Sequence, residues 1–239
     1  MMRGDILTTK TNVAAIILAA GSGSRMNSPV PKQRMEILGE SILERSVKTF
    51  THAPSVSSIV VVVRSDELET VRSMLGKKSL NKPFTVVSGG RTRQESAAIG
   101  YREASKNAEF IAIHDAARCL ITVDMIEAVI DSALKYGAAT ASCPVSDTIK
   151  RVRCEFIEET VPRSELVAAQ TPQVFSSALY GRALSSLSSC EEITDDNMLV
   201  ERIGEKIICV NTGKENVKIT TPEDIIYAEF ILNKRNCNE

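Results

Sequence analysis

The fold is decided by the stretch VAAIILAAGSGSRM at residues 13–26, which PKQ follows at residues 31–33. Its first six residues are apolar and partly β-branched, and small residues follow abruptly, so the pattern predicts a buried strand leading into a Gly-rich loop. Small residues let a ligand approach the backbone closely, and successive backbone N–H groups form a concavity for anions. The small residues are Ala19, Ala20, Gly21 and Gly23. Because Arg25 and Lys32 add two positive charges, the stretch predicts a binding site for a triphosphate.

Two common Gly-rich loops do not match this stretch. A dinucleotide-binding fingerprint needs a third glycine where Met26 stands, and the sequence contains no GxxxxGK[ST] loop of the Walker A type. An ordinary Gly-rich turn with surface Arg and Lys side chains is the alternative for GSG alone. The longer pattern LAAGxGxRM followed by PKQ is more specific, and it resembles the signature of the sugar-phosphate nucleotidyltransferases.

The length suits one large α/β domain, or one domain with an appendage, and the cysteines indicate a reducing compartment. The 239 residues are 43% hydrophobic, and 29 basic against 30 acidic residues give a net charge of −1. This balance argues against broad binding of nucleic acids or membrane surfaces, so a polyanion site must be a local pocket. Six scattered cysteines without a CxxC pair indicate reduced thiols, and no run of about 18 apolar residues is present. We therefore expect a cytoplasmic protein.

Strands and helices are expected to alternate up to about residue 145. The pattern predicts strands at residues 13–18, 59–63, 84–87, 110–114 and 138–144. It predicts one helix that begins at Ser41 with a capping-box spacing to Glu44. The other helices are expected at residues 67–75, 92–104 and 123–136. This alternation implies right-handed crossovers and an α/β fold with a mostly parallel, Rossmann-like sheet flanked by helices.

Three candidate ligand loops fall at the carboxyl ends of these strands, where open α/β sheets bind their ligands. The first is the loop at Gly21, the second is SGGRTRQES at residues 88–96, and the third is HDAAR at residues 114–118. Because the strands are expected to be parallel, the three loops should meet at one edge of the sheet.

The alternation stops at Asp147, where residues 147–153 and 156–161 predict a charged hairpin about a polar turn. A hairpin this poor in core residues is marginal alone, so we expect it to project and to gain stability from a second copy of the chain. An ordinary surface hairpin is the alternative. The expected organisation is a flexible leader at 1–12, one nucleotidyltransferase domain at 13–232 with an arm at 147–169, and a tail at 233–239.

Three helices and one strand are expected after the hairpin. The pattern predicts a helix at residues 177–187, then a helix with Thr194 as its N-cap, and a strand at 207–211. The last helix begins with TPED at residues 221–224, which combines an N-cap, a proline at the first position and acids in the first turn.

The residues favour phosphoryl-type transfer over nucleophilic catalysis by the protein. Only two histidines are present, of which His52 is expected at the surface, and the motifs GxSxG and HExxH are absent. A phosphomonoester acceptor is already an anion, so the protein needs to align two polyanions and neutralise charge. The candidate cations are Arg25, Lys32, Arg93, Arg118 and Lys218. Asp115 is the candidate to hold Mg²⁺ or another divalent cation. Its alternatives are a capping role at a strand end and a pairing with Arg118.

Further motifs extend the resemblance from about Val13 to Leu232. They are GGxxRQxS at 89–96, HDAAR at 114–118, DTIK at 147–150, QTPQ at 170–173, TDD at 194–196 and NVKITxPED at 216–224. With them the chain resembles the 2-C-methyl-D-erythritol 4-phosphate cytidylyltransferases of non-mevalonate isoprenoid biosynthesis. The resemblance implies transfer of CMP from CTP to that acceptor, release of pyrophosphate, and Mg²⁺ as the cofactor.

The resemblance also implies roles for individual residues. Arg25 and Lys32 would bind the CTP phosphates and stabilise the transition state, and the backbone at residues 19–21 with Gly90 and Ser96 would recognise cytosine. The other nucleotide-binding residues would be Gly23, Arg93 and Asp115. The residues near the ribose, the metal and the acceptor would be Asp115, Arg118, Thr171, Thr194 and the catalytic Lys218. In a homodimer, the arm would bring Thr148, Lys150 and the catalytic Arg163 to the acceptor phosphate of the neighbouring site.

Three residues depart from the family pattern. Cys119 stands where the family usually has proline, Ala97 replaces a more usual valine, and Arg91 adds a positive charge beside the base-binding loop. These changes bear on the fine geometry of the site more than on the reaction class.

Three other functions are alternatives to the transfer of CMP to methylerythritol phosphate. A ribitol 5-phosphate cytidylyltransferase shares the fold and the nucleotide, but such proteins tend to carry AGG where AAG stands at residues 19–21. The second rival is a nucleotidyltransferase that acts on another phosphorylated acceptor. The third is a non-catalytic nucleotide-binding regulator, which would be expected to lack Arg25 or Lys32.

Overall fold

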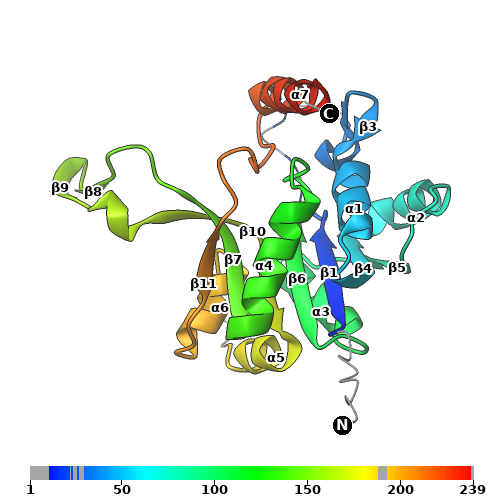
Figure 1. The fold of residues 1–239 in the computed structure, drawn as a ribbon, viewed down its shortest axis with the longest axis horizontal. Helices are drawn as coiled ribbons and strands as arrows, with labels where there is room; N and C mark the ends of the chain where they lie inside the picture. The colour runs from blue at the N-terminus through cyan, green and yellow to red at the C-terminus, as the bar shows by residue number, and fades with distance from the viewer. Residues whose placement is uncertain (1–10, 22, 24–25, 27–29, 188–192, 238–239) are drawn as a thin grey trace, which may run out of the picture.

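A computed structural model describes residues 11–21, 23, 26, 30–187 and 193–237. Its centre is a seven-stranded sheet with the strand order β11-β7-β10-β6-β1-β4-β5 (Figure 1). The strands are β1 (Val13–Leu18), β4 (Val56–Val63), β5 (Phe84–Ser88), β6 (Phe110–Asp115), β7 (Ala138–Pro144), β10 (Val167–Ser176) and β11 (Ile208–Asn211). A small hairpin pairs β2 (Glu36–Ile37) with β3 (Glu40–Ser41).

Most neighbouring strands of the sheet are parallel, as predicted. β1 pairs in parallel with β4 and β6, β4 pairs with β5, and β7 pairs with β11. The exception is β10, which lies antiparallel between β6 and β7. The sequence pattern did not predict this strand, because polar residues and Pro172 interrupt its apolar alternation.

Helices cover both faces of the sheet (Figure 1). They are α1 (Ile42–His52), α2 (Leu68–Gly76), α3 (Arg93–Ala104), α4 (Val123–Tyr136), α5 (Ser177–Ser185), α6 (Asp196–Arg202) and α7 (Pro222–Asn236). Short 3₁₀ turns are η2 (Lys32–Arg34), η3 (Ser65–Glu67) and η4 (Arg163–Glu165). Alternate residues of β1 enter two different cores: Ile17 packs with residues of α1, α2 and α4, whereas Ile16 packs with residues of α3, α5 and α6. Burial on both faces explains why β1 is an unbroken apolar run.

A third apolar cluster attaches α7 to the body. It joins Ile42 and Ile219 with Ala228 and Ile231 of α7, and it also contains Cys119. The Cys119 side chain thus packs in a core, and burial raises the pKa of its thiol to about 11. Ala97, another departure from the family pattern, lies on α3 and is fully buried in the core.

Local capping signals set the ends of several helices. Ser41 and Glu44 form the predicted capping box at α1, and Thr221 and Asp224 form one at α7. The prediction for α6 was wrong by one residue, because Asp195 is the N-cap and its Oδ1 accepts from the Met198 N–H at 3.1 Å. The exposed Thr194 precedes the cap, and its hydroxyl lies 3.8 Å from the Met198 sulfur.

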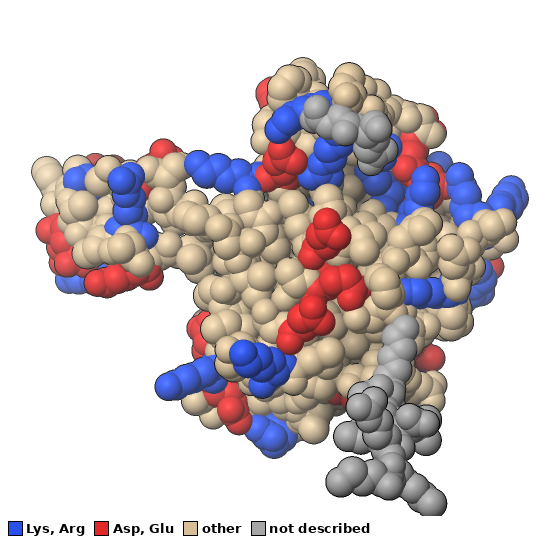
Figure 2. Space-filling view, viewed as in Figure 1, with Lys and Arg blue, Asp and Glu red and all other residues tan. Residues whose placement is uncertain are grey.

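The predicted hairpin is present and projects from the body as an arm (Figure 1). It consists of β8 (Lys150–Arg153) and β9 (Phe156–Thr160), and each of their residues is exposed. Apolar side chains stand open on it, with Phe156 78% and Ile157 64% exposed. Figure 2 shows acidic and basic side chains gathered on this arm as well. Such apolar exposure is typical of a surface that another protein covers.

The structure describes only part of the expected leader and of the expected tail. Residues 1–10 of the expected leader lie outside the described residues, whereas the Asn12 carbonyl accepts from the Glu109 N–H at 2.9 Å. α7 continues to Asn236, past the expected domain end at residue 232. Within the described ranges, the helices are too short or too polar for any of them to cross a membrane.

Candidate active site

A cavity of about 380 Å³ opens at the carboxyl ends of β1, β5 and β6. The three loops that the sequence singled out meet there. The predicted residues that line it are Ala20, Gly21, Gly23, Lys32, Gly90, Arg93, Ser96, Asp115 and Lys218. Parallel strands place these residues together, because their carboxyl ends share one edge of the sheet. Arg25 lies outside the described residues.

Gln33 ties the start of the first loop to the turn η2. Its Nε2 donates to the carbonyl oxygens of Ala19 at 2.6 Å and Gly21 at 2.7 Å. Gly23 has a φ of +64°, and a Cβ there would lie 2.9 Å from the Cβ of Lys32. A glycine is therefore needed at this turn, both for its left-handed backbone and for the close approach of Lys32. The Lys32 Nζ donates to the Ile219 carbonyl at 3.1 Å.

The second loop lies directly beside the first. A Cβ at Gly89 would come within 2.7 Å of the Ser96 Oγ and 2.8 Å of the Ala20 Cβ, so a glycine here allows the two loops to touch. The Ser96 hydroxyl accepts from the Gly90 N–H at 3.1 Å and donates to the Thr92 carbonyl at 2.9 Å. Ser96 thereby ties the loop to the first turn of α3.

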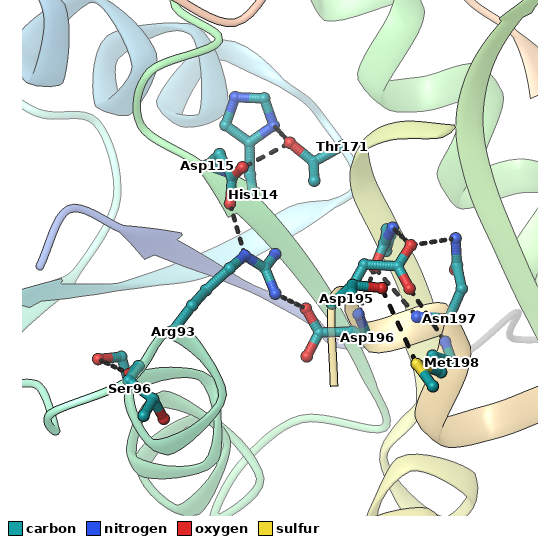
Figure 3. Close-up of polar contacts among 12 residues, drawn as sticks. Arg93, Ser96, His114, Asp115, Thr171, Asp195, Asp196, Asn197 and Met198 are labelled. Atoms are coloured by element: carbon teal, nitrogen blue, oxygen red, sulfur yellow. Dashed lines mark hydrogen bonds and ion pairs between the residues drawn. The ribbon is translucent and has the colours of Figure 1, made fainter. Parts of the chain in front are cut away.

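Three charged side chains form a cluster across the cavity. Asp115 accepts from the Arg93 Nε at 3.1 Å and from the Lys218 Nζ at 2.6 Å (Figure 3 shows the Arg93 contact). Burial acts to raise the pKa of Asp115, but Arg93 and Lys218 outweigh burial and hold this pKa well below its usual range. Burial acts to lower the pKa of Arg93, whereas Asp196 and Asp115 together raise it above the ordinary value. The site thus carries a fixed carboxylate between two cations.

A buried relay supports the strand end that carries Asp115. The Asp115 N–H donates to the Thr171 Oγ1 at 3.1 Å, and the Thr171 hydroxyl lies 3.1 Å from the Nδ1 of His114 (Figure 3). The His114 Nε2 lies 3.3 Å from the Arg118 carbonyl oxygen. A carbonyl only accepts, so we assign the histidine proton to Nε2, and Thr171 donates to Nδ1. Burial lowers the pKa of His114 to about 3, which keeps the ring neutral.

Arg118 and Thr171 are not among the residues that line the cavity. Thr171 is 4% exposed, and the guanidinium of Arg118 donates through Nη1 to the Asn216 carbonyl at 2.8 Å. Arg118 does not form an ion pair with Asp115, because the ion-pair partners of Asp115 are Arg93 and Lys218. Burial lowers the pKa of Arg118, and its Nε has no hydrogen-bond partner among the described residues.

The arm residues do not reach the cavity of their own chain. Lys150 donates to the Thr160 hydroxyl at 2.7 Å across the hairpin, and Arg163 donates to the Ser146 carbonyl at 3.1 Å. Thr148 and Thr194 are exposed and are not among the residues that line the cavity. Within one chain, the structure therefore brings together the nucleotide-binding candidates but not the arm.

Two residues that support the site had no role assigned from the sequence. Gln33 belongs to the motif PKQ, and Asn216 begins the motif NVK. The partners of their side-chain amides cannot be inferred from the neighbouring residues in the sequence. Asn216 is fully buried, and its Nδ2 donates to the Gln170 Oε1 at 3.0 Å and the Thr171 carbonyl at 2.9 Å. It therefore anchors the segment that carries Lys218.

Comparisons with known proteins agree with this geometry. The sequence model of the family "2-C-methyl-D-erythritol 4-phosphate cytidylyltransferase" matches residues 13–234. A protein of that name from Caldanaerobacter subterraneus subsp. tengcongensis is 42% identical over 93% of this chain and 100% of its own length. One from Geobacillus kaustophilus is 37% identical over 94% of this chain and 98% of its own.

A solved structure supports the same relationship. The 4-diphosphocytidyl-2C-methyl-D-erythritol synthase of Anaerococcus prevotii superimposes with a TM-score of 0.83 at 29% identity, covering 94% of this chain and 97% of that one. The fold, the loops of the cavity and the matched length agree, and the chain belongs to the 2-C-methyl-D-erythritol 4-phosphate cytidylyltransferase family.

Proposed function

We propose that this chain transfers CMP from CTP to 2-C-methyl-D-erythritol 4-phosphate, releasing pyrophosphate and forming 4-diphosphocytidyl-2-C-methyl-D-erythritol. The observation that supports it most is the cavity in which the Gly-rich loop, Lys32 and the Arg93–Asp115–Lys218 cluster meet, in a member of this family. A Gly-rich anion loop suits the triphosphate, and the second loop suits the base.

The described residues at the cavity suit catalysis by position and charge. The acceptor phosphate is itself the nucleophile, so no protein base is required. His114 is buried, neutral and outside the cavity lining, which fits that mechanism. As the acceptor phosphate attacks the α-phosphorus of CTP, a new P–O bond forms, the bond to the leaving pyrophosphate breaks, and Lys32 and Lys218 stabilise the growing negative charge. Arg25 is proposed to act with Lys32.

We also propose Mg²⁺ as the cofactor. Asp115 is the one carboxylate among the described residues that line the cavity, and both of its oxygens already face cations. A single carboxylate fits Mg²⁺, because this ion is commonly bound by one or two carboxylates and by substrate phosphates. Bound there, Mg²⁺ would neutralise phosphate charge, while the protein residues align the substrates.

The arm supports the proposal of a homodimer with shared sites. Arg163 and Lys150 are exposed, and Phe156 and Ile157 are exposed on the same arm. We propose that the arm of one protomer reaches the cavity of its partner, where Thr148, Lys150 and Arg163 contact the acceptor phosphate. The other proposed acceptor-binding residues are Arg118, Thr171 and Thr194. A cytoplasmic location is proposed from the scattered free thiols.

The test is pyrophosphate release from CTP and Mg²⁺ with each acceptor separately: methylerythritol 4-phosphate, ribitol 5-phosphate, and none. Release with the first acceptor alone is the expected result. Release with ribitol 5-phosphate instead would keep the chemistry and change the acceptor. CTP binding without release with either acceptor would contradict the proposed activity and favour another acceptor or a regulatory role.

A further inference from the structure

Asp196 lies behind the cavity and contacts a cation that lines it. Its carboxylate is 2% exposed and accepts from the Arg93 Nη1 at 2.7 Å. Its other oxygen accepts from the Tyr180 hydroxyl at 2.6 Å. The Asp196 N–H donates to the Gln173 Oε1 at 2.9 Å, so the first turn of α6 is held as well. Asp196 itself does not line the cavity.

Tyr180 is fixed by the packing of its ring as well as by its hydrogen bond to Asp196. The side chain is fully buried on α5, its ring meets the Tyr101 ring edge-on at 5.2 Å, and it stacks on Phe175 at 5.5 Å. A buried phenol needs a partner for its hydroxyl, and here that partner is Asp196. Burial and the neighbouring carboxylate raise the pKa of Tyr180 well above its usual value, so the hydroxyl remains a donor.

The contacts form a chain that runs from the core to the cavity. Tyr180 holds Asp196, Asp196 holds Arg93, and Arg93 holds Asp115 (Figure 3 shows the Asp196–Arg93–Asp115 part). Only the outer members, Arg93 and Asp115, line the cavity. The two carboxylates engage the Nε and Nη1 of Arg93, which leaves Nη2 without a partner among the described residues.

We infer that Tyr180 and Asp196 are positioning residues that hold the Arg93 guanidinium ready for the nucleotide. This inference rests on the proposed function, because it assigns CTP as the molecule that Arg93 meets. An arginine side chain loses rotamer freedom when it binds a phosphate or a ribose, and fixing it beforehand removes part of that entropic cost. Neither Tyr180 nor Asp196 lines the cavity, so each acts through Arg93.

The experiment compares Tyr180→Phe with Tyr101→Phe. Each variant removes one phenolic hydroxyl from the same aromatic group, since the Tyr101 hydroxyl donates to the Ser177 carbonyl at 2.9 Å, away from the cavity. We measure steady-state kinetics, CTP affinity by calorimetric titration, and Tm. Tyr180→Phe should raise the KM and Kd for CTP about 5- to 10-fold while kcat changes less, whereas Tyr101→Phe should lower Tm comparably and leave both constants unchanged.

Two further variants keep the test decisive if Tyr180→Phe folds poorly. Asp196→Asn keeps the shape of the side chain and removes its charge, and it should weaken CTP binding in the same direction. In an Arg93→Ala background, Tyr180→Phe should add no further loss of CTP affinity, because the residue through which it acts is gone.

Each remaining outcome has a defined meaning. Equal changes in CTP affinity for the two tyrosine variants would overturn the inference. So would a loss of CTP affinity from Tyr180→Phe that is undiminished in the Arg93→Ala background. In either case, turnover by the wild-type chain would still uphold the proposed function. A wild-type chain that neither binds CTP nor releases pyrophosphate would overturn the proposed function and this inference with it.

Discussion

The Nζ of Lys218 lies 2.6 Å from the Oδ2 of Asp115, although 103 residues separate the two in the sequence. Asp115 ends β6, and Lys218 lies in the segment between β11 and α7. Because Arg93 occupies the other carboxylate oxygen, one buried anion holds two cations that would otherwise repel each other. Cations placed in advance are what a site for transferring phosphoryl-type groups needs.

Asp115→Asn tests this arrangement. The amide keeps the shape of the side chain but no longer offsets the charges of Arg93 and Lys218, so both cations should move apart. We expect kcat/KM to fall by about 10²-fold, the scale of one lost electrostatic contribution. The matched control is Asp131→Asn on the exposed side of α4, which should behave as wild type. Wild-type kinetics in Asp115→Asn would contradict the assigned role.

Gly89→Ala tests the contact between the two loops. The added Cβ would meet the Ser96 Oγ at 2.7 Å and the Ala20 Cβ at 2.8 Å, and neither short side chain can move far. The loops should separate, and the Kd for CTP should rise about tenfold or more, as expected for a cost of at least about 1.4 kcal/mol. Gly76→Ala is the control, since a Cβ there meets nothing within 4 Å. Calorimetric titration with CTP measures the Kd of each variant. Equal Kd values for Gly89→Ala and Gly76→Ala would contradict the close packing of the two loops.

The buried His114 should make the free energy of unfolding depend on pH. Its pKa is lowered to about 3 in the fold, whereas the unfolded chain takes up the proton near the ordinary value of about 6.5. Between these values the unfolded state binds more protons, so the stability that the neutral ring contributes is present above pH 6.5 and is lost on acidification. The free energy of unfolding should fall by up to about 1.4 kcal/mol per pH unit in this window.

Denaturant unfolding of wild type and His114→Gln between pH 7 and pH 5 measures this effect. The variant should be less stable at pH 7, because it loses the ring that packs 4.9 Å from Phe50 and contacts Thr171. Its stability should also change less with pH. Equal slopes for the two proteins would show that His114 is not the group that titrates on unfolding.

Mixed dimers test the proposed exchange of arms. Lys32→Ala should lower kcat by about 10²- to 10³-fold, since it removes one cation from the cavity. Arg163→Ala should also be impaired if this exposed residue acts in the partner's cavity. Mixing the two inactive variants should restore part of the activity, because some sites then combine an intact cavity with an intact arm. Demonstrated subunit exchange without recovery would contradict a shared site.

Local signals determined much of the fold. The apolar run at Val13–Leu18 predicted β1 with its observed bounds, and the spacing of Ser41 and Glu44 predicted the start of α1. The alternation of strands and helices predicted the mostly parallel sheet, and the glycines at residues 21, 23 and 90 predicted where the loops of the cavity lie. Each of these features depends on neighbours within a few residues, which is why a pattern in the sequence can indicate it.

Long-range partners decided the rest. β10 was not predicted, because its buried polar residues Gln170 and Gln173 are satisfied by partners at Thr212 and Asp195, which no local pattern connects to them. Likewise Arg118 pairs with the carbonyl of Asn216, 98 residues away, and Asp196, which accepts from Tyr180, pairs with Arg93, 103 residues away. The sequence by itself determined most of the elements and the charges of the site. Only the tertiary structure decided which charge meets which, since a buried polar group must find whatever partner the packing of distant elements brings to it.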